Sequence, residues 1–269
     1  MVVGRVGMSK FDDRKKQILE VLKKDIKISV SEASVLIGTS PATTRRFFSR
    51  LEGEGNAVRV HGGIQLVPED RGTYSYVLSN TSRVMEKARI ADRGKELVSS
   101  GDLLFLDSGT TILKLAEALV PRLERGELTD LVVVTNSLLN YERLAEFAKV
   151  IIVGGEIRLS RRDTFGQLAE NALQSLHLHK SFFGADAIHP TKGLMTTDEW
   201  TNRMNNIVSN NTEEVYVLAD SNKFGKSSLM TYAGLGDAQL IITDDGITEE
   251  RLATYREKGA NIEVVPMAG

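Results

Sequence analysis

Short apolar runs alternate with helical patterns through the second half of the chain, and this alternation limits the fold more than any other sequence feature. Continuous apolar runs of this length are typical of strands buried on both faces, and the segments between them can supply the covering helices. The runs are Leu103–Leu106, Leu131–Val134, Val150–Val153, Lys180–Phe183, Val215–Leu218, Leu240–Thr243 and Ile262–Val265. The pattern therefore predicts an α/β domain with a mostly parallel sheet.

The N-terminal segment has a different pattern, with three short helices followed by two short strands. Ser29 or Ser31 can cap the second helix, and Ser40 can cap the third, with Pro41 at its first helical position. The turn His61-Gly62-Gly63 lets the two strands pair as a hairpin. The expected helices are 12–24, 31–37 and 41–51, and the expected strands are 57–60 and 64–67. This order predicts a winged helix-turn-helix domain over residues 8–67.

The third helix has one apolar and one cationic face. Thr44, Phe48 and Leu51 fall on the inward side at helical spacing. Arginines and small hydroxyl residues on the outward side are the groups that contact guanine edges and phosphates. The predicted DNA-binding residues are Ser40, Thr43, Arg45, Arg46, Ser49 and Arg50, with Arg59 and His61 on the wing. The alternative readings are a solvated helix and, for His61, an ordinary turn histidine.

Charge is unevenly distributed along the chain. The net charge is −2, but residues 8–66 carry 11 Lys and Arg against 7 Asp and Glu, an excess of four positive charges. The remainder is acidic, with a net charge of −6. A basic N-terminal segment on an acidic body supports a nucleic-acid partner for that segment.

The remaining organisation follows from composition. Residues 68–81 are polar and turn-rich and are expected to be a linker, with residues 82–269 forming the second domain and a long helix over 82–99. Further helices are expected at 111–119 and 138–148. The chain has no cysteine, no apolar run long enough to span a bilayer and no secretory signal in residues 1–10. We therefore expect a cytoplasmic protein without disulfides and without a membrane partner.

Small polar residues follow the predicted strands. The strongest motif is Asp107-Ser108-Gly109-Thr110-Thr111, which ends a strand and opens a helix, so its hydroxyl groups and helix N-terminus can bind an anion. Ligands of parallel sheets bind at the carboxyl ends of strands. The predicted effector-binding residues are Asp107, Ser108, Gly109, Thr110, Thr111, Thr135, Asn136, Ser137, Gly154, Gly155, Asp186 and Lys223. Any single one of these sites, taken alone, is better explained as a helix cap.

Both halves resemble the DeoR family of transcription regulators. The resemblance rests on residues 31–33, 38–46, 51–52 and 61–63 in the N-terminal half, and on residues 86–87, 101–102, 105–107, 135–136 and 219–225 in the other. Phe47 stands where the family usually has aspartate, and Thr44 replaces a branched aliphatic residue. We expect Phe47 to place an apolar ring on the polar face, and Thr44 to cost a little core packing.

The resemblance also implies a fold and residue roles for the second domain. The family's sensor domain is similar in fold to ribose-5-phosphate isomerase and glucosamine-6-phosphate deaminase. By this resemblance, Ser108 to Thr111 would hold a phosphate, Lys223 would add a positive charge, and Asp186 would meet sugar hydroxyl groups.

Other polar residues carry weaker expectations. Asp163 and Arg161-Arg162 are expected either near the ligand or as solvated loop charges. His177 and His179 are spaced to face the same way on a strand, but no carboxylate pattern surrounds them, so no metal site is expected. Trp200 is either a pocket lid or a packing residue.

These observations favour a regulator over an enzyme. Sugar-phosphate isomerisation needs a base, and the stretch 202–206, where the related isomerase carries its glutamate, has no carboxylate, although Glu199 is nearby. We expect a repressor of a carbohydrate-use operon that a sugar-phosphate effector releases from a double-stranded DNA operator. It should need no cofactor and form a homo-oligomer, a dimer or tetramer. The alternatives are a sugar-phosphate isomerase or deaminase and a structural module.

Overall fold

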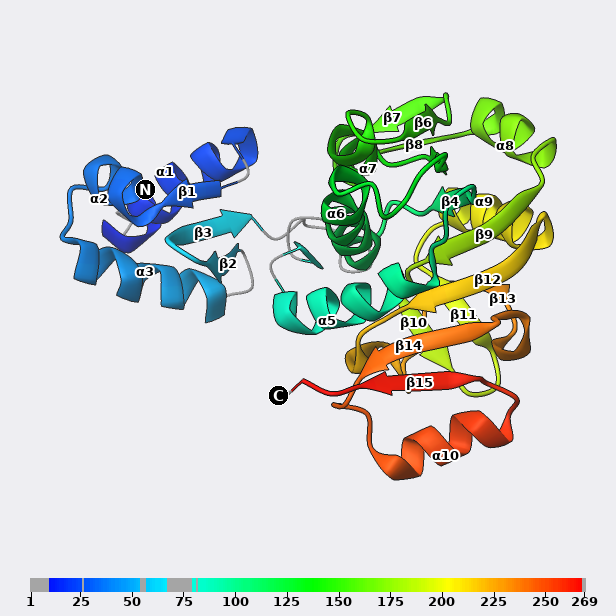
Figure 1. Ribbon diagram of the computed structural model, residues 1–269. Coiled ribbons are helices and arrows are strands. Elements are labelled where there is room, and N and C mark those ends of the chain that lie inside the picture. Colours follow the sequence, from blue (N-terminus) through cyan, green and yellow to red (C-terminus); the bar gives the residue numbers. More distant parts are fainter. Residues whose placement is uncertain (1–9, 26, 54–56, 67–78, 81, 268–269) are drawn as a thin grey trace, which may run out of the picture. The chain divides into compact units, whose positions relative to one another are not determined.

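The computed structural model describes residues 10–25, 27–53, 57–66, 79–80 and 82–267 (Figure 1). The chain divides into two compact units, Met1–Thr81 and Ser82–Gly269. The segment expected to be a linker lies outside the described residues except for Ser79 and Asn80.

The N-terminal unit combines three helices with a small antiparallel sheet (Figure 1). Its strands lie in the order β1-β3-β2, so β2 and β3 form the expected hairpin. A third strand, β1, which the sequence analysis missed, pairs with β3 on its other side. Its elements are α1 (Lys10–Asp25), β1 (Lys27–Ser29), α2 (Val30–Leu36), α3 (Pro41–Gly53), β2 (Ala57–Val60) and β3 (Gly63–Leu66). The predicted winged helix-turn-helix fold is confirmed.

Local chemistry explains where the helices begin. Ser29 caps α2 in a reciprocal capping box: its hydroxyl accepts from the Glu32 N–H at 3.2 Å, and the Glu32 carboxylate accepts from the Ser29 N–H at 2.9 Å. Ser40 caps α3 and accepts from the Thr43 N–H at 3.3 Å. These two caps fix where α2 and α3 begin.

A buried hydroxyl cluster joins α2 to α3. Thr44 is fully buried, and its hydroxyl lies 2.9 Å from the hydroxyls of both Ser34 and Thr39. The Ser34 hydroxyl also donates to the carbonyl of Val30. The expected loss of packing at Thr44 is therefore offset, because this residue hydrogen-bonds the two helices together.

The C-terminal unit alternates strands and helices around one large sheet. Its helices are α5 (Val84–Gly94), α6 (Thr110–Glu124), α7 (Leu138–Leu144), α8 (Gln167–Gln174), α9 (Glu199–Asn210) and α10 (Glu249–Glu257), with short 3₁₀ turns at Lys95–Leu97, Ser221–Lys223 and Leu235–Asp237. Its strands are β4 (Leu103–Leu106), β5 (Val132–Thr135), β6 (Lys149–Ile152), β7 (Glu156–Arg158), β8 (Asp163–Phe165), β9 (Leu178–Phe183), β10 (Ala187–His189), β11 (Gly193–Thr196), β12 (Thr212–Leu218), β13 (Met230–Ala233), β14 (Leu240–Asp244) and β15 (Ile262–Val265). The expected helix over 82–99 is shorter, because a 3₁₀ turn replaces its last part.

The seven strands of the large sheet are all parallel and follow the order β15-β14-β12-β9-β4-β5-β6. Separate apolar clusters cover its two faces. One contains residues of α5, α6 and α7, and the other contains residues of α8, α9 and α10 (Figure 1). The predicted α/β fold with a parallel sheet is confirmed.

Two smaller sheets were not foreseen. Strands β7 and β8 form an antiparallel hairpin, and β10, β11 and β13 form a three-stranded antiparallel sheet. Both consist of three- or four-residue strands, which are too short to show a clear period in sequence. In the described part of the chain, no helix combines the length and apolar content that crossing a membrane requires.

Candidate functional site

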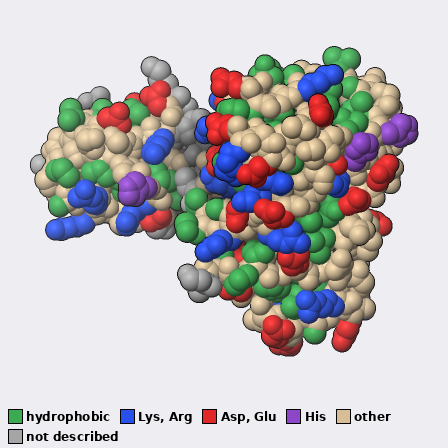
Figure 2. Space-filling model, viewed as in Figure 1, with side chains coloured by type: hydrophobic (Ala, Val, Ile, Leu, Met, Phe, Trp, Pro, Cys, Tyr) green, Lys and Arg blue, Asp and Glu red, His purple; other side chains and the backbone are tan. Residues whose placement is uncertain are grey.

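The outward face of α3 has the composition expected from the sequence. Thr43, Arg45, Arg46, Ser49 and Arg50 are all exposed, whereas Thr44, Phe48 and Leu51 are buried. In Figure 2, Lys and Arg side chains gather on the side of the N-terminal unit where Figure 1 places α3. The exposed face thus offers guanidinium and hydroxyl groups to a polyanion.

The wing is tied to this helix through Arg59. Its Nη1 donates to the Ser49 hydroxyl at 2.7 Å, and its backbone N–H donates to Oε1 of Glu52 at 2.9 Å. His61 is exposed in the turn, where Gly62 has a φ of +79°. Arg59 therefore lies beside α3, and His61 at the tip of the hairpin.

Phe47 does not lie on the polar face, so the expectation for this residue is wrong. Its side chain is only 8% exposed, and its ring centroid is 4.9 Å from that of Phe11 in α1. A partner on α1, far away in sequence, turns the ring into the core. The described exposed face of α3 therefore keeps its polar character.

In the C-terminal unit, the predicted effector residues gather at one edge of the large sheet. The strands are parallel, and the register pairs Leu106 of β4 with Thr135 of β5 and with Phe182 of β9. Their following loops therefore lie together at the carboxyl edge. Gly109 is the N-cap of the 15-residue helix α6, and as a glycine it makes no side-chain capping hydrogen bond. Such a helix start favours an anion.

Asp107 is the most perturbed carboxylate of this edge. It is 6% exposed, and its Oδ2 accepts from the Gly184 N–H at 3.2 Å. Burial raises the pKa of Asp107 to about 6, although the N–H groups of Ser108 and Gly184 oppose the rise. Gly109 has an ordinary φ of −67°, so its backbone angle does not require glycine.

Asp163 is a buried member of the site rather than a solvated loop charge. It is fully buried, and Arg158 binds both of its oxygens, at 2.9 and 2.7 Å. The Ser108 hydroxyl donates to the same carboxylate at 3.1 Å. Arg161 and Arg158 also each donate to Asp198, at 2.9 and 2.8 Å. We call Arg158, Arg161, Asp163 and Asp198 the charge clasp.

The charge clasp was only partly visible in sequence. Arg161 is 8% exposed, whereas Arg162 is more exposed and pairs with Glu142. Arg158 was missed entirely, because it belongs to β7, a strand the sequence did not reveal. The two arginines hold the pKa of Asp198 below its usual value despite burial.

Some predicted residues serve the loops themselves. The Thr135 hydroxyl donates to the carbonyl of Leu106 at 2.6 Å, and Ser137 caps α7. A Cβ on Gly155 would lie 2.3 Å from the carbonyl oxygen of Phe165, so β8 requires glycine there. By contrast, the buried Oδ1 of Asn136 has no hydrogen-bond partner among the described residues.

Lys87, which carries part of the family resemblance, was not among the predicted effector residues but lies near the same sheet edge. It comes from α5 and is only 2% exposed. Burial lowers the pKa of Lys87 to about 8; Asp220 opposes this shift, and Lys223 adds to it. Both neighbours follow β12, which lies two strands from β4, or about 10 Å along the edge. A lysine inside an otherwise apolar helix face would have been the signal.

The remaining candidates are placed as follows. Asp186 Oδ2 accepts from both the N–H and the hydroxyl of Thr197, at 2.8 and 2.9 Å. Glu199 is exposed and pairs with Arg203 at 3.4 Å. Trp200 packs against Phe165, with ring centroids 5.6 Å apart.

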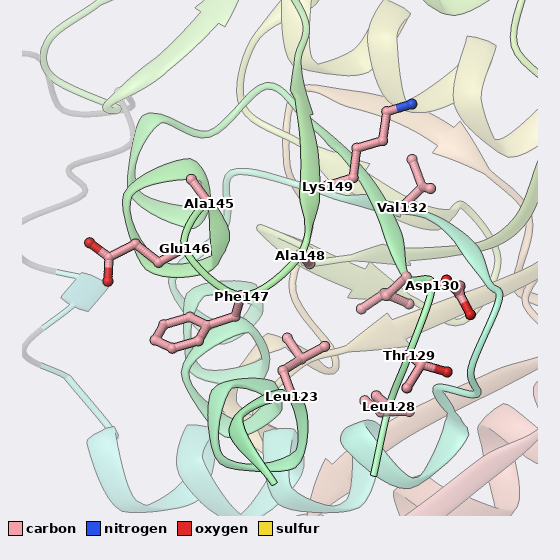
Figure 3. A pocket seen from close by; sticks show the side chains of 11 residues that line it. Leu123, Leu128, Thr129, Asp130, Val132, Ala145, Glu146, Phe147, Ala148 and Lys149 are labelled. Atoms are coloured by element: carbon pink, nitrogen blue, oxygen red, sulfur yellow. The ribbon is translucent and has the colours of Figure 1, made fainter. Parts of the chain in front are cut away.

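Two further features of the described residues, a pair of histidines and a surface hollow, lie away from the carboxyl edge of the sheet. His177 and His179 are exposed, and β9 begins only at Leu178. The described residues hold no group of three or more His, Asp or Glu side chains suited to a metal ion. A hollow of about 600 Å³ lies at the opposite, amino edge of β5 and β6, lined among others by Leu123, Phe147 and Lys149 (Figure 3).

A winged helix-turn-helix unit and an α/β unit with polar strand ends together define a DNA-binding transcription regulator with a sensor domain. The chain belongs to the DeoR family: residues 14–69 match the DeoR-like helix-turn-helix domain, and residues 82–245 match the DeoR C-terminal sensor domain. Members of this family are regulators rather than enzymes.

Named relatives cover nearly the whole chain. A proposed aga operon transcriptional repressor of Escherichia coli O157:H7 is 30% identical over 97% of this chain and 97% of its own length. The lactose phosphotransferase system repressor of Streptococcus mutans serotype c is 29% identical over 91% of this chain and 98% of its own length.

Among solved structures, ribose 5-phosphate isomerase A from Methanocaldococcus jannaschii is 21% identical, with a TM-score of 0.39 over 51% of this chain and 53% of that one. This similarity is too low to transfer any residue's role.

Proposed function

We propose that this regulator represses a carbohydrate-use operon and leaves its operator when a sugar phosphate binds the carboxyl edge of the large sheet. The observation that carries the proposal is that two cationic features lie at the same edge of the sheet. One is the N-terminus of α6, whose N-cap residue makes no side-chain hydrogen bond; the other is Lys87 with Lys223, two strands away. The phosphate would bind at one of these cationic ends. The names of the relatives, which refer to the aga operon and to a lactose phosphotransferase system, support a carbohydrate effector.

The sugar hydroxyl groups would lie between these two ends. The end of β9 lies there in the sheet order, followed by Gly184, Ala185 and Asp186. Asp107 and Asn136 face the same edge as buried acceptors. Buried polar groups that a hydroxyl can satisfy favour a polyol over an apolar ligand.

The protein would act as a cytoplasmic homo-oligomer, a dimer or tetramer, with paired α3 helices reading two half-sites of double-stranded DNA. Effector binding would shift the population of states towards a poorer DNA-binding geometry. A coupling of about 1–3 kcal/mol between the two sites suffices for this.

A thermal-shift screen tests the effector. Sugar phosphates and the matching unphosphorylated sugars are added to the full chain, and the reaction mixtures are checked for products. A phosphorylated sugar at about 100 times its Kd should stabilise the chain by about 2.7 kcal/mol without being converted. Equal stabilisation by the unphosphorylated sugar would contradict a phosphate site, and turnover would contradict a sensor.

A further inference from the structure

Arg50 on the exposed face of α3 lies over the ring of Phe11, one member of an aromatic pair. Its guanidinium carbon is 3.7 Å from the centroid of the Phe11 ring. Phe11 is half-buried and packs in turn on the buried Phe47, with ring centroids 4.9 Å apart and planes tilted by 51°. We call Phe11 and Phe47 the aromatic shelf. The shelf joins α1 to α3 and ends under an exposed cation.

The shelf and the wing lie on different flanks of α3. Thr43, Arg46 and Arg50 form one stripe at helical spacing, and Arg45 and Ser49 form the next. Arg59 of the wing binds Ser49, whereas Phe11 of α1 lies under Arg50. On each flank of α3, therefore, one arginine is held by a contact between α3 and another element: Arg59 by Ser49, and Arg50 by Phe11.

We propose that Arg50 binds a DNA phosphate on the α1 flank of α3, and that Phe11 is its positioning residue; this rests on the proposed DNA-binding role. Stacking engages the face of the guanidinium, whereas phosphate oxygens bind N–H groups in its plane, so both interactions are compatible. A stacked arginine has also lost part of its rotamer freedom before DNA arrives.

The assignment to phosphate follows from where Arg50 lies. It is nine residues after Pro41, the first residue of α3, and recognition helices contact bases chiefly with their N-terminal residues. A cation near the other end of the helix, on a flank, faces the sugar–phosphate backbone beside the groove. Its contribution should therefore be independent of base sequence.

Binding of the full chain to a short duplex of random sequence tests this without knowledge of the operator. Arg50→Ala should lower affinity equally on all duplexes and reduce the slope of log affinity against log salt by about 1. Phe11→Leu, which keeps an apolar side chain but removes the ring, should weaken binding about two- to fivefold. Phe11→Tyr keeps the ring face and should bind like the wild type.

A double-mutant cycle separates positioning from general stability. If Phe11 acts through Arg50, adding Phe11→Leu to Arg50→Ala should cause no further loss. Fully additive losses would overturn the positioning role, and a loss confined to particular sequences would overturn the phosphate assignment. If Phe11→Leu lowers the Tm too far to be assayed, Arg50→Lys, which keeps the charge without the planar group, replaces it and should bind more weakly. A wild-type chain that binds no duplex would instead contradict the DNA-binding role itself.

Discussion

Ser108 donates its hydroxyl hydrogen to the carboxylate of Asp163 at 3.1 Å, although 55 positions separate them along the chain. Ser108 belongs to the loop proposed to hold the phosphate, and Asp163 belongs to the charge clasp. A phosphate that takes the Ser108 hydroxyl would remove one hydrogen bond from the clasp. At the proposed site, effector binding and the β7–β8 hairpin would therefore be linked through a single hydroxyl group.

Asp163→Asn should destabilise the C-terminal unit. The change leaves the buried Arg161 and the partly buried Arg158 with one carboxylate instead of two, and breaking a buried ion pair costs about 3–5 kcal/mol. Urea unfolding measures the loss. The control is Glu142→Gln, which removes an exposed partner of Arg162 and should change stability by less than about 0.5 kcal/mol. Equal losses in both variants would show that the clasp has no special weight.

Lys87→Met should stabilise the chain at pH 7 and weaken its binding of the effector. The pKa of Lys87 is about 8 in the folded chain against 10.5 for the unperturbed side chain. The native state therefore binds fewer protons between these values, so wild-type stability rises with pH through that window. The charged lysine costs up to about 3 kcal/mol at pH 7, and the methionine variant should lack this cost and the rise.

The measurement is urea unfolding at pH 7 and at pH 10, with the exposed Lys226→Met as the control. A Lys87→Met chain with the wild-type pH profile would contradict the burial of a charged ammonium group. Unchanged stabilisation by a sugar phosphate would remove Lys87 from the effector site.

Asp107→Asn should also change how stability depends on pH, but in the direction opposite to that expected for Lys87→Met. Here the folded pKa of about 6 lies above the unperturbed value of 3.8, so the native state binds more protons in between, and the wild type loses stability as pH rises through that window. Relative to the wild type, the asparagine variant should gain about 2 kcal/mol between pH 4 and pH 8. Unfolding at both pH values measures this, with the exposed Asp130→Asn as the matched control.

Arg46→Ala should weaken operator binding by about 1–3 kcal/mol and relax base preference, because an exposed arginine in the first half of α3 can bind a guanine edge. Binding to selected operator sequences at fixed salt measures the loss. Stabilisation by the effector should remain, because it belongs to the other unit. Loss of both responses would mean that the substitution unfolds the chain.

Thr44→Val should lower the stability of the N-terminal unit by about 1–2 kcal/mol. The substitution keeps the side-chain shape but removes the hydroxyl that meets Ser34 and Thr39 in a buried place. Thr43→Val, one residue away on the exposed face, is the matched control for thermal unfolding. A valine at position 44 that stabilises the unit would show that packing outweighs the hydroxyl cluster.

The parts of the fold that sequence predicted are those with a clear period or cap. The seven strands of the large sheet, the cap at Ser40 and the helix start at Pro41 follow from local pattern, because burial on both faces and helix starts leave residue-level signals. The prediction for Phe47 was wrong because the environment of its ring depends on Phe11, whose position local spacing cannot give. For the same reason Arg158 was missed and Lys87 was given no role in the site: the place of a charged residue depends on its tertiary burial.

The strand order of the large sheet has a consequence for synthesis. β4, β5 and β6 adjoin one another, but β4 also needs β9, which begins at Leu178, and β9 needs β12. The winged helix-turn-helix, by contrast, is complete once β3 ends at Leu66. Because domains fold in order from the N-terminus during synthesis, we expect the winged helix-turn-helix of a nascent chain to be folded before its sensor domain can fold. A chain truncated before β12 would therefore bind operator DNA but could not respond to the effector.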